Sequence, residues 1–393
     1  MNKNILKSGV QNFIKNSKHT DTVSVLLKKP IFEDISNKEL AEQIEAYHKT
    51  KKKLPHWFES ANIFYPNKLN IEQTSSETTA KYKSSLVNGK SLVDLTGGLG
   101  VDSYFFSKKF EKIIHCEINK NLSEIARHNF QELGANNIIA LNKNGIEFLR
   151  ETPERFDAIF VDPSRRDSLK KKVFMLQDCT PDMIENLELL LNKSNQVLIK
   201  TSPLLDISLG LKELTNVHGI HIVAVENEVK ELLWLIKKEA SNALTIETVN
   251  IHKKGVLQFQ FDYKDEQEAT ATFSNPLQYL YEPNSAILKS GAFKIISQQL
   301  GIHKLHENSH LYTSENIIHF PGRRFRIEKS LPYNRKSQRE LKGIKANIST
   351  RNFPLSVQEI KSKHKIQDGG SRYIFFTKLM DATTSFLICS KIP

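Results

Sequence analysis

Cysteine is scarce in this chain of 393 residues, and its scarcity excludes two kinds of site. The three cysteines, Cys116, Cys179 and Cys389, are scattered and form no CxxC motif. A disulfide framework needs paired cysteines, and a zinc site needs clustered Cys or His ligands. We therefore expect no metal and no disulfides, and a reducing cytoplasm as the location.

Long hydrophobic runs are missing as well. Hydrophobic residues make up 39% of the chain and charged residues 25%, which is ordinary for a globular protein. No apolar run approaches the roughly 20 residues that cross a bilayer. The N-terminal residues also lack the apolar core and cleavage site of a signal peptide. We therefore expect no membrane partner.

Acidic residues are in deficit at both ends of the chain, which carries a net charge of +12. Residues 1–53 hold 11 Lys and Arg against 6 Asp and Glu, and residues 266–393 hold 19 against 10. Residues 54–265 hold the remaining 26 against 28. Basic flanks around a near-neutral centre fit a polyanionic partner. A solubilising surface would explain the same charges equally well.

Strand and helix patterns alternate between residues 91 and 238, after a helical stretch over residues 1–60. This alternation predicts a doubly wound α/β domain, and the pattern over 219–238 predicts a closing antiparallel hairpin. After about residue 250 strands and helices mix without this repeat, which predicts an α+β region. There we expect one helix over residues 285–302, ended by Gly301. Upstream, Thr74, Ser75 or Ser76 is the expected N-cap of a helix, and Glu77 follows Thr74 at capping-box spacing.

A glycine turn follows the first expected strand, in the sequence VDLTGGLGVDS (93–103). A dinucleotide fingerprint needs G-x-G-x-x-G, but Ser103 stands where the third glycine would follow Gly98 and Gly100. No Gly-Lys-Ser/Thr ending follows either, which argues against a Walker loop. Both phosphate-binding interpretations are therefore weak.

S-adenosylmethionine has different needs, and this region meets them. Asp94 ends the first expected strand and suits the ammonium group of the cofactor. Glu117 ends the second, 23 residues later, and suits the ribose hydroxyls. Asn144 follows the third strand and suits the adenine amine. The other candidate cofactor contacts are the turn and the residue after Glu117: Thr96, Gly97, Gly98, Gly100 and Ile118.

At this point the chain resembles the class I S-adenosylmethionine-dependent methyltransferases. VDLTGGLGVDS resembles their first motif, CEIN (116–119) resembles their second, and residues 72–83 are similar to a helix found before the first strand in RNA-methylating members. The resemblance implies a Rossmann-like seven-stranded sheet that ends in an antiparallel hairpin. It also implies S-adenosylmethionine as the cofactor.

The stretch FDAIFVDPSRRD (156–167) resembles the fourth motif of amino methyltransferases. The resemblance implies that Asp162 and Pro163 orient the methyl acceptor. Ser164 and Arg165 replace the second proline and the aromatic residue of that motif, which argues against methylation of a base amine. We therefore expect a substrate site at residues 162–165, with a motif that departs from that of the base-amine methyltransferases.

Several polar residues near this motif are candidate substrate contacts. Arg165 and Arg166 suit a phosphate or a base, or else pair with Asp157 or Asp167. Ser164 stands beside them. Lys200 ends the next strand, where it either lines the substrate pocket or is an ordinary strand-end residue. The segment after that strand has no cysteine, which favours direct in-line transfer over covalent catalysis.

The C-terminal region carries the most specific resemblance. Four segments resemble bacterial class I methyltransferases with a ferredoxin-like segment and a C-terminal THUMP-like domain: residues 279–293, 320–325, 346–354 and 365–377. Because THUMP domains bind RNA, the resemblance implies an RNA partner. Arg323, Arg324 and Arg326, with Phe325 among them, suit RNA backbone and bases. An amphipathic edge strand is the equally good alternative.

The sequence thus predicts an S-adenosylmethionine-dependent methyltransferase that acts on structured RNA, either tRNA or rRNA. We expect four parts, namely a helical segment (1–70), the methyltransferase domain (71–250), a ferredoxin-like segment (251–335) and a THUMP-like domain (336–393). Two alternatives stay open at this point. One is a methyltransferase for a small molecule or a protein, and the other is a non-catalytic RNA-binding protein. The oligomeric state is left open.

Overall fold

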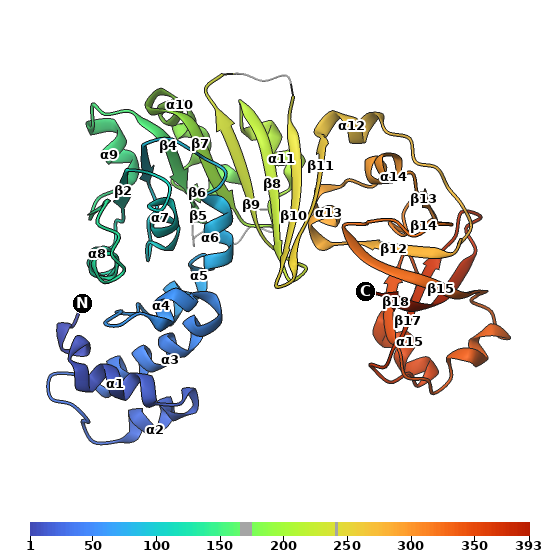
Figure 1. Cartoon of the computed structure of the whole chain (residues 1–393), viewed down its shortest axis with the longest axis horizontal. Coiled ribbons are helices and arrows are strands. Elements are labelled where there is room, and N and C mark those ends of the chain that lie inside the picture. The colour runs from blue at the N-terminus through green and yellow to red at the C-terminus, as the bar shows by residue number, and fades with distance from the viewer. Residues whose placement is uncertain (166–174, 240–242) are drawn as a thin grey trace. The chain divides into compact units, whose positions relative to one another are not determined.

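The computed structural model describes residues 1–165, 175–239 and 243–393 (Figure 1). The chain divides into two compact units. The first comprises Met1–Ile220 and Glu231–Asn242, and the second comprises His221–Lys230 and Ala243–Pro393. Within the described part of the chain, we find no helix that combines the length and the apolar character of a membrane span.

Six α-helices open the first unit, and the first four lie within the helical stretch that the sequence predicts over residues 1–60. They are α1 (Ser8–Asn16), α2 (Thr22–Leu27), α3 (Asn37–Lys53), α4 (Pro55–Glu59), α5 (Lys68–Gln73) and α6 (Glu77–Lys83). Ser36 and Glu39 form a capping box that starts α3. Pro55 occupies the first turn of α4, where its missing N–H costs nothing.

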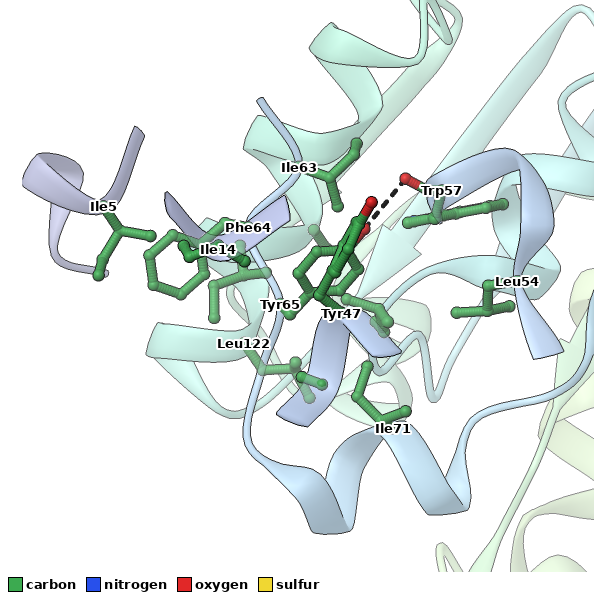
Figure 2. Packing of buried hydrophobic residues seen from close by; sticks show 14 of the residues in the cluster. Ile5, Ile14, Tyr47, Leu54, Trp57, Ile63, Phe64, Tyr65, Ile71 and Leu122 are labelled. Carbon is green, nitrogen blue, oxygen red and sulfur yellow. Dashed lines mark hydrogen bonds between the residues drawn. The ribbon is translucent and has the colours of Figure 1, made fainter. Parts of the chain in front are cut away.

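The six helices share a hydrophobic core with the helices that flank the first strands of the sheet. Figure 2 shows this core, in which Leu122 of α8 (Lys120–Glu132) lies among side chains from the N-terminal helices. Trp57 is fully buried there, and its carbonyl accepts a hydrogen bond from the Tyr65 hydroxyl at 3.1 Å. The helical segment is therefore packed as part of the first unit.

A nine-stranded mixed sheet has the order β11-β10-β8-β9-β7-β4-β1-β2-β3. Its strands are β1 (Ser91–Asp94), β2 (Lys112–Cys116), β3 (Ile138–Leu141), β4 (Phe156–Val161), β7 (Ser194–Thr201), β8 (Val217–Val225), β9 (Glu228–Lys237), β10 (Thr245–His252) and β11 (Gly255–Asp262). The connecting helices are α7 (Val101–Phe106), α8, α9 (Gly145–Glu151), α10 (Met183–Lys193) and α11 (Ile207–Glu213). Strands β1, β2, β3, β4 and β7 run parallel, and β9 pairs antiparallel with β7.

This sheet confirms the predicted α/β class and the closing antiparallel hairpin. The seven expected strands are all present, and β9 lies between β7 and β8. Strands β10 and β11 extend the sheet, with β10 paired to β11 from Thr245–Asp262 to His252–Gly255. β10 was not predicted, because the change of pattern near residue 250 falls inside it.

The second unit contains a seven-stranded sheet of order β13-β14-β12-β15-β18-β17-β16. Its strands are β12 (Tyr279–Pro283), β13 (His303–Lys304), β14 (Tyr312–Ser314), β15 (Gly322–Pro332), β16 (Asn347–Arg351), β17 (Arg372–Lys378) and β18 (Thr384–Ile392). Helices α12 (Tyr263–Glu268), α13 (Ser285–Ser290), α14 (Ile295–Leu300) and α15 (Val357–His364) accompany it.

A two-stranded ladder in the first unit pairs β5 (Ser164–Arg165) with β6 (Cys179–Thr180).

Two local predictions were wrong. The helix expected over 285–302 is broken, because Gly291 ends α13 with φ +78° and the chain restarts at α14. The capping box expected from Thr74 to Glu77 does not form. Of the three expected N-caps, Ser76 is the one that caps α6, by accepting the Thr79 amide. The Glu77 carboxylate instead accepts the amide of His56 at 2.6 Å.

Candidate functional site

A cavity of about 790 Å³ opens at the carboxyl ends of the parallel strands β1, β2, β4 and β7. In an open α/β sheet this edge is where ligands bind, because the loops that follow the strands diverge there. The cavity wall brings together nine residues that the sequence singled out as site candidates: Thr96, Gly97, Gly98, Glu117, Ile118, Asn144, Asp162, Ser164 and Lys200.

The turn after β1 requires glycine for two different reasons. At Gly97 a Cβ atom would lie 2.2 Å from Nε2 of the buried His115 ring, so no side chain fits. At Gly100 the backbone is left-handed, with φ +85°, and a Cβ atom would meet the Phe130 ring at 2.2 Å. Burial lowers the pKa of His115 to about 4, so this ring stays neutral beneath the turn.

Glu117 ties the turn to the end of β2. Its carboxylate accepts the backbone amide of Gly98 at 2.9 Å and that of Asn119 at 2.7 Å. Next to it, Ile118 is 72% exposed on the cavity wall. An acid and an exposed apolar side chain thus stand side by side at the cavity.

Asp94 lies beneath the turn rather than on the cavity wall. Its carboxylate is 1% exposed and accepts the Ser103 hydroxyl at 2.6 Å and the Thr96 amide at 3.1 Å. Burial raises the pKa of Asp94 to about 7, and the neighbouring Asp102 and Asp162 carboxylates add to the rise. Its predicted role as the ammonium contact stays a prediction.

Asn144 caps α9 from the cavity wall. Its side-chain oxygen accepts the amides of Ile146 at 2.9 Å and Glu147 at 3.3 Å. The amide side chain is therefore held in place by the helix start, as an N-cap residue commonly is. Its contact with adenine stays a prediction.

The fourth motif begins where β4 ends. The Asp162 amide donates to the Thr96 hydroxyl at 2.7 Å, which joins this segment to the glycine turn. The Asp162 carboxylate forms an ion pair with the ammonium of Lys200 from β7. Pro163 is buried, and Ser164 is exposed in β5. Arg165 continues β5, and Arg166 lies outside the described residues.

Sequence reasoning missed a buried cluster next to this pair. The Lys83 ammonium is fully buried and contacts both carboxylate oxygens of Glu231, at 2.9 and 2.8 Å. It also lies 3.2 Å from Asp102 and donates to the Ser75 hydroxyl at 3.1 Å. Ser75 in turn donates to Asp102 at 2.7 Å. Asp102 and Ser75 line the cavity.

These charges act on Lys200 as well. Burial lowers the pKa of Lys200, but the carboxylates of Asp162, Glu231 and Asp102 outweigh burial and raise it above its ordinary value. Burial raises the pKa of Glu231, while Lys83 and Lys200 oppose the rise. Lys200, Asp102 and Asp162 therefore line the cavity, and the ion pair of Lys83 with Glu231 is buried next to them.

The arginines of β15 are placed differently from the prediction of an RNA-binding cluster. Arg323 pairs with the buried carboxylate of Glu282, which also accepts Arg351 at 3.0 Å. Arg324 donates to the carbonyl of Pro393. Phe325 is fully buried in the core of the second unit. The expectation that Phe325 meets RNA bases was therefore wrong, and the contacts of Arg323 and Arg324 with RNA stay predictions.

Among the residues that the structure describes, no group of three or more His, Cys, Asp and Glu side chains is placed to hold a metal ion. The three cysteines are all buried as free thiols. Burial raises the pKa of Cys116 to about 12, so this thiol lacks the activation that a nucleophile needs.

Two family models match the C-terminal part of the chain, in the order that the sequence predicts. Residues 279–321 match a ferredoxin-like domain family, and residues 322–391 match a THUMP-like domain family. These matches place β15 in the THUMP-like domain, whereas the sequence-based division placed it before residue 336. No curated protein matches the chain.

Three solved structures illustrate the range of similarity. A Porphyromonas gingivalis W83 protein assigned as a methyltransferase is 33% identical, with a TM-score of 0.90 over 100% of this chain and 99% of that one. A Streptococcus mutans protein assigned as a methyltransferase, solved with S-adenosylhomocysteine, is 15% identical over 42% of this chain and 97% of that one, with a TM-score of 0.32. An rRNA methylase from Streptococcus thermophilus is 15% identical over 41% and 96%, with a TM-score of 0.31.

The first of these similarities covers both chains from end to end, so it extends through the cavity, the ferredoxin-like domain and the THUMP-like domain. The resemblance inferred from the sequence motifs is thereby confirmed. The chain belongs to the family of bacterial class I S-adenosylmethionine-dependent methyltransferases that carry ferredoxin-like and THUMP-like C-terminal domains.

Proposed function

We propose that this protein is a cytoplasmic methyltransferase that uses S-adenosylmethionine to methylate structured RNA, either tRNA or rRNA. The observation that carries the proposal is the cavity itself. It joins the glycine turn and Glu117 on one side to the Asp162–Lys200 pair on the other. A methyl donor and a methyl acceptor would therefore share one space at the edge of the sheet.

The residues of the first side fit the cofactor. Glu117 offers carboxylate oxygens for ribose hydroxyls, and the exposed Ile118 offers an apolar contact for the adenine ring. The narrow glycine turn lets the backbone approach a ligand closely. When bound, S-adenosylmethionine supplies an electrophilic methyl group on a sulfonium.

The residues of the second side would position the acceptor. Asp162 is fixed by the hydrogen bond that its backbone amide donates to the Thr96 hydroxyl and by its ion pair with Lys200. Fixing a nucleophile in line with a methyl group removes much of the entropic cost of a two-body reaction. Because Cys116 is buried with a raised pKa, we favour direct transfer without a covalent enzyme intermediate.

RNA is the acceptor that the second unit supports. Residues 266–393 carry 19 Lys and Arg against 10 Asp and Glu, and residues 322–391 match the THUMP-like family. A surplus of cations on a compact domain attracts the phosphate backbone without regard to sequence. We therefore assign RNA holding to this unit and chemistry to the first.

Transfer of labelled methyl from S-adenosylmethionine to total RNA tests the proposal. RNA from a strain that lacks this gene is the substrate, and already modified wild-type RNA is the control. We expect label only in the RNA of the deletion strain. Label in neither RNA, with cofactor binding intact, would contradict an RNA acceptor and favour a small-molecule or protein acceptor; assembled ribosomal particles are the substrate to include in the same assay.

A further inference from the structure

We propose that the methyl acceptor in this cavity is a ribose 2′-hydroxyl of RNA, and that Lys200 and Asp162 are the catalytic residues that activate it. This inference rests on the proposed RNA methyltransferase function and adds the acceptor atom. It starts from the two charged side chains that line the cavity and form an ion pair there.

An exocyclic base amine does not match this pair. Such an amine presents N–H donors and must keep its electron pair free for the attack, so it needs hydrogen-bond acceptors around it. The Lys200 ammonium, which lies against the Asp162 carboxylate, is a donor only, so beside an amine it would compete with the methyl group for the nitrogen electron pair. Arg165 stands where the fourth motif of the base-amine enzymes has its aromatic residue. Both features disfavour a base amine in this position.

A hydroxyl matches both members of the pair at once. Its oxygen can accept a hydrogen bond from the Lys200 ammonium, while its O–H donates to the Asp162 carboxylate. The RNA ribose offers such a hydroxyl at the 2′ position, which DNA lacks. A ribose also needs no aromatic platform, in agreement with the replacement of the aromatic residue by Arg165. The charged pair therefore selects an oxygen acceptor.

The transfer step balances with these two residues. The 2′-oxygen electron pair forms a bond to the sulfonium methyl carbon, and the carbon–sulfur bond breaks with its electron pair remaining on sulfur. The cofactor becomes the neutral thioether, and the hydroxyl proton passes to the Asp162 carboxylate and then to solvent. The Lys200 ammonium stabilises the negative charge that develops on oxygen as that proton leaves. No further oxidant, reductant or metal enters the step.

The buried cluster explains why Lys200 can play this part. The carboxylates of Asp162, Glu231 and Asp102 hold Lys200 in its protonated form. Lys83 neutralises Glu231 by contacting both of its carboxylate oxygens, and it lies 3.2 Å from Asp102. Lys83 and Glu231 act through Lys200 and Asp102, so we assign them as positioning residues.

Alkaline hydrolysis of methyl-labelled RNA tests the acceptor atom. Alkali cleaves RNA through the free 2′-hydroxyl, so a methylated 2′-oxygen leaves an alkali-resistant dinucleotide. We expect the label in dinucleotides. Label in mononucleotides would overturn the 2′-hydroxyl inference while leaving RNA methylation intact. RNA that takes up no label, with the cofactor bound, would overturn the proposed function and this inference together.

Variants of the pair test the two catalytic roles. We expect Lys200→Met and Asp162→Asn each to lower kcat by about 10²–10³-fold, the usual effect of removing one group that stabilises developing charge. S-adenosylmethionine affinity, measured by calorimetry, should change less than threefold, and this also shows that each variant is folded. An unchanged kcat in either folded variant would overturn its role.

Glu231→Gln tests the positioning role. The variant removes one carboxylate that holds the Lys200 proton, while Asp162, Asp102, Lys83 and Asp94 still surround the site. We expect the alkaline limb of the kcat profile to move to lower pH. Glu228→Gln is the matched control, because Glu228 lies on the same strand with its side chain 74% exposed. A profile that falls equally at every pH would overturn the positioning role of Glu231.

Discussion

Each unit of this protein buries a glutamate among cationic side chains. The cluster in the first unit borders the ligand cavity, whereas the cluster in the second unit holds strands together. In the first unit, Glu231 meets the fully buried lysine Lys83 beside a cavity. In the second unit, Glu282 accepts Arg323 and Arg351, whose side chains remain 43% and 35% exposed. The lysine cluster places charges next to a ligand space, whereas the arginine cluster joins strands β12, β15 and β16.

The type of cation fits this difference. A guanidinium presents a rigid fork of donors that holds a carboxylate in one geometry, which suits a structural clasp. An ammonium is a compact point charge, and its pKa responds strongly to its surroundings. The pKa of Lys200 accordingly responds to the carboxylates of Asp162, Glu231 and Asp102. The comparison teaches that a buried ion pair indicates chemistry only where it also borders a cavity.

The largest expected effect comes from Lys83→Met. This change leaves the Glu231 carboxylate buried without its main partner, so we expect a loss of about 3–5 kcal/mol in the free energy of unfolding. Urea denaturation measures it. The double variant Lys83→Met with Glu231→Leu is the control, and it should recover most of the loss because the buried charge is gone. A single variant as stable as the wild type would show that the cluster is solvated in solution.

Glu282→Gln should have a smaller effect on stability. The two arginines that it releases are partly exposed and can be hydrated, so we expect a loss of about 1–3 kcal/mol. Cofactor affinity, measured by calorimetry, should remain that of the wild type, because Glu282 belongs to the other unit. A large fall in cofactor affinity would contradict the assignment of a purely structural role to the Glu282 cluster.

Glu117→Ala should weaken S-adenosylmethionine binding by about 10–100-fold, since hydrogen bonds to a charged group contribute about 1.5–3 kcal/mol each. Calorimetry gives the affinity directly. Glu117→Gln is the matched variant, because it keeps an oxygen for the Gly98 amide and loses only the charge. We expect an intermediate affinity for it, and equal affinity in all three proteins would refute the ribose contact.

Arg324→Ala should change RNA binding by the smallest amount among these variants. If Arg324 contacts one phosphate, the affinity falls uniformly across RNA sequences and the salt dependence of binding loses about one unit of slope. Filter binding over a range of salt concentrations measures both. Arg351→Ala serves as the comparison, because Arg351 pairs with Glu282. Identical salt slopes in the wild type and Arg324→Ala would remove Arg324 from the interface.

The pH dependence of stability adds a test of Asp94. Its pKa in the folded protein is about 7, above the ordinary carboxyl value of 3.8. The folded state therefore binds more protons than the unfolded state between these values, so the contribution of Asp94 to stability falls as pH rises from about 4 to 7. Asp94→Asn cannot ionise, so the wild type should lose stability relative to this variant over that window. Parallel pH profiles in urea denaturation would contradict the raised pKa.

Local signals in the sequence were sufficient for much of the fold and part of the site. The glycine turn and Glu117 follow their strands directly, so strand order alone predicted that they would meet. Asp162 and Lys200 stand at the ends of the neighbouring strands β4 and β7, so strand order also placed them near each other. The broken helix at Gly291 was missed because the apolar pattern continues across it, although glycine at a helix end is a known stop signal.

The rest depends on contacts that no local pattern encodes. Lys83 and Glu231 are 148 residues apart in the chain, and only the folded sheet brings them together. The one available signal was Glu231 beside the otherwise apolar run LLWLI, where a charge is costly unless paired. Phe325 was misjudged because strand alternation does not tell which face is buried. The ion pair of Arg323 could not be predicted either, because its carboxylate, Glu282, comes from another strand.

Nucleoside analysis of RNA from living cells is the most direct test of the central claim. Total tRNA and rRNA from wild-type and deletion strains are digested to nucleosides and compared by mass spectrometry. We expect one 2′-O-methylated nucleoside to fall in the deletion strain, to return with the wild-type gene, and to stay low with Lys200→Met. Identical nucleoside inventories in the two strains would contradict an RNA methyltransferase, and a missing base-methylated nucleoside would contradict the ribose acceptor alone.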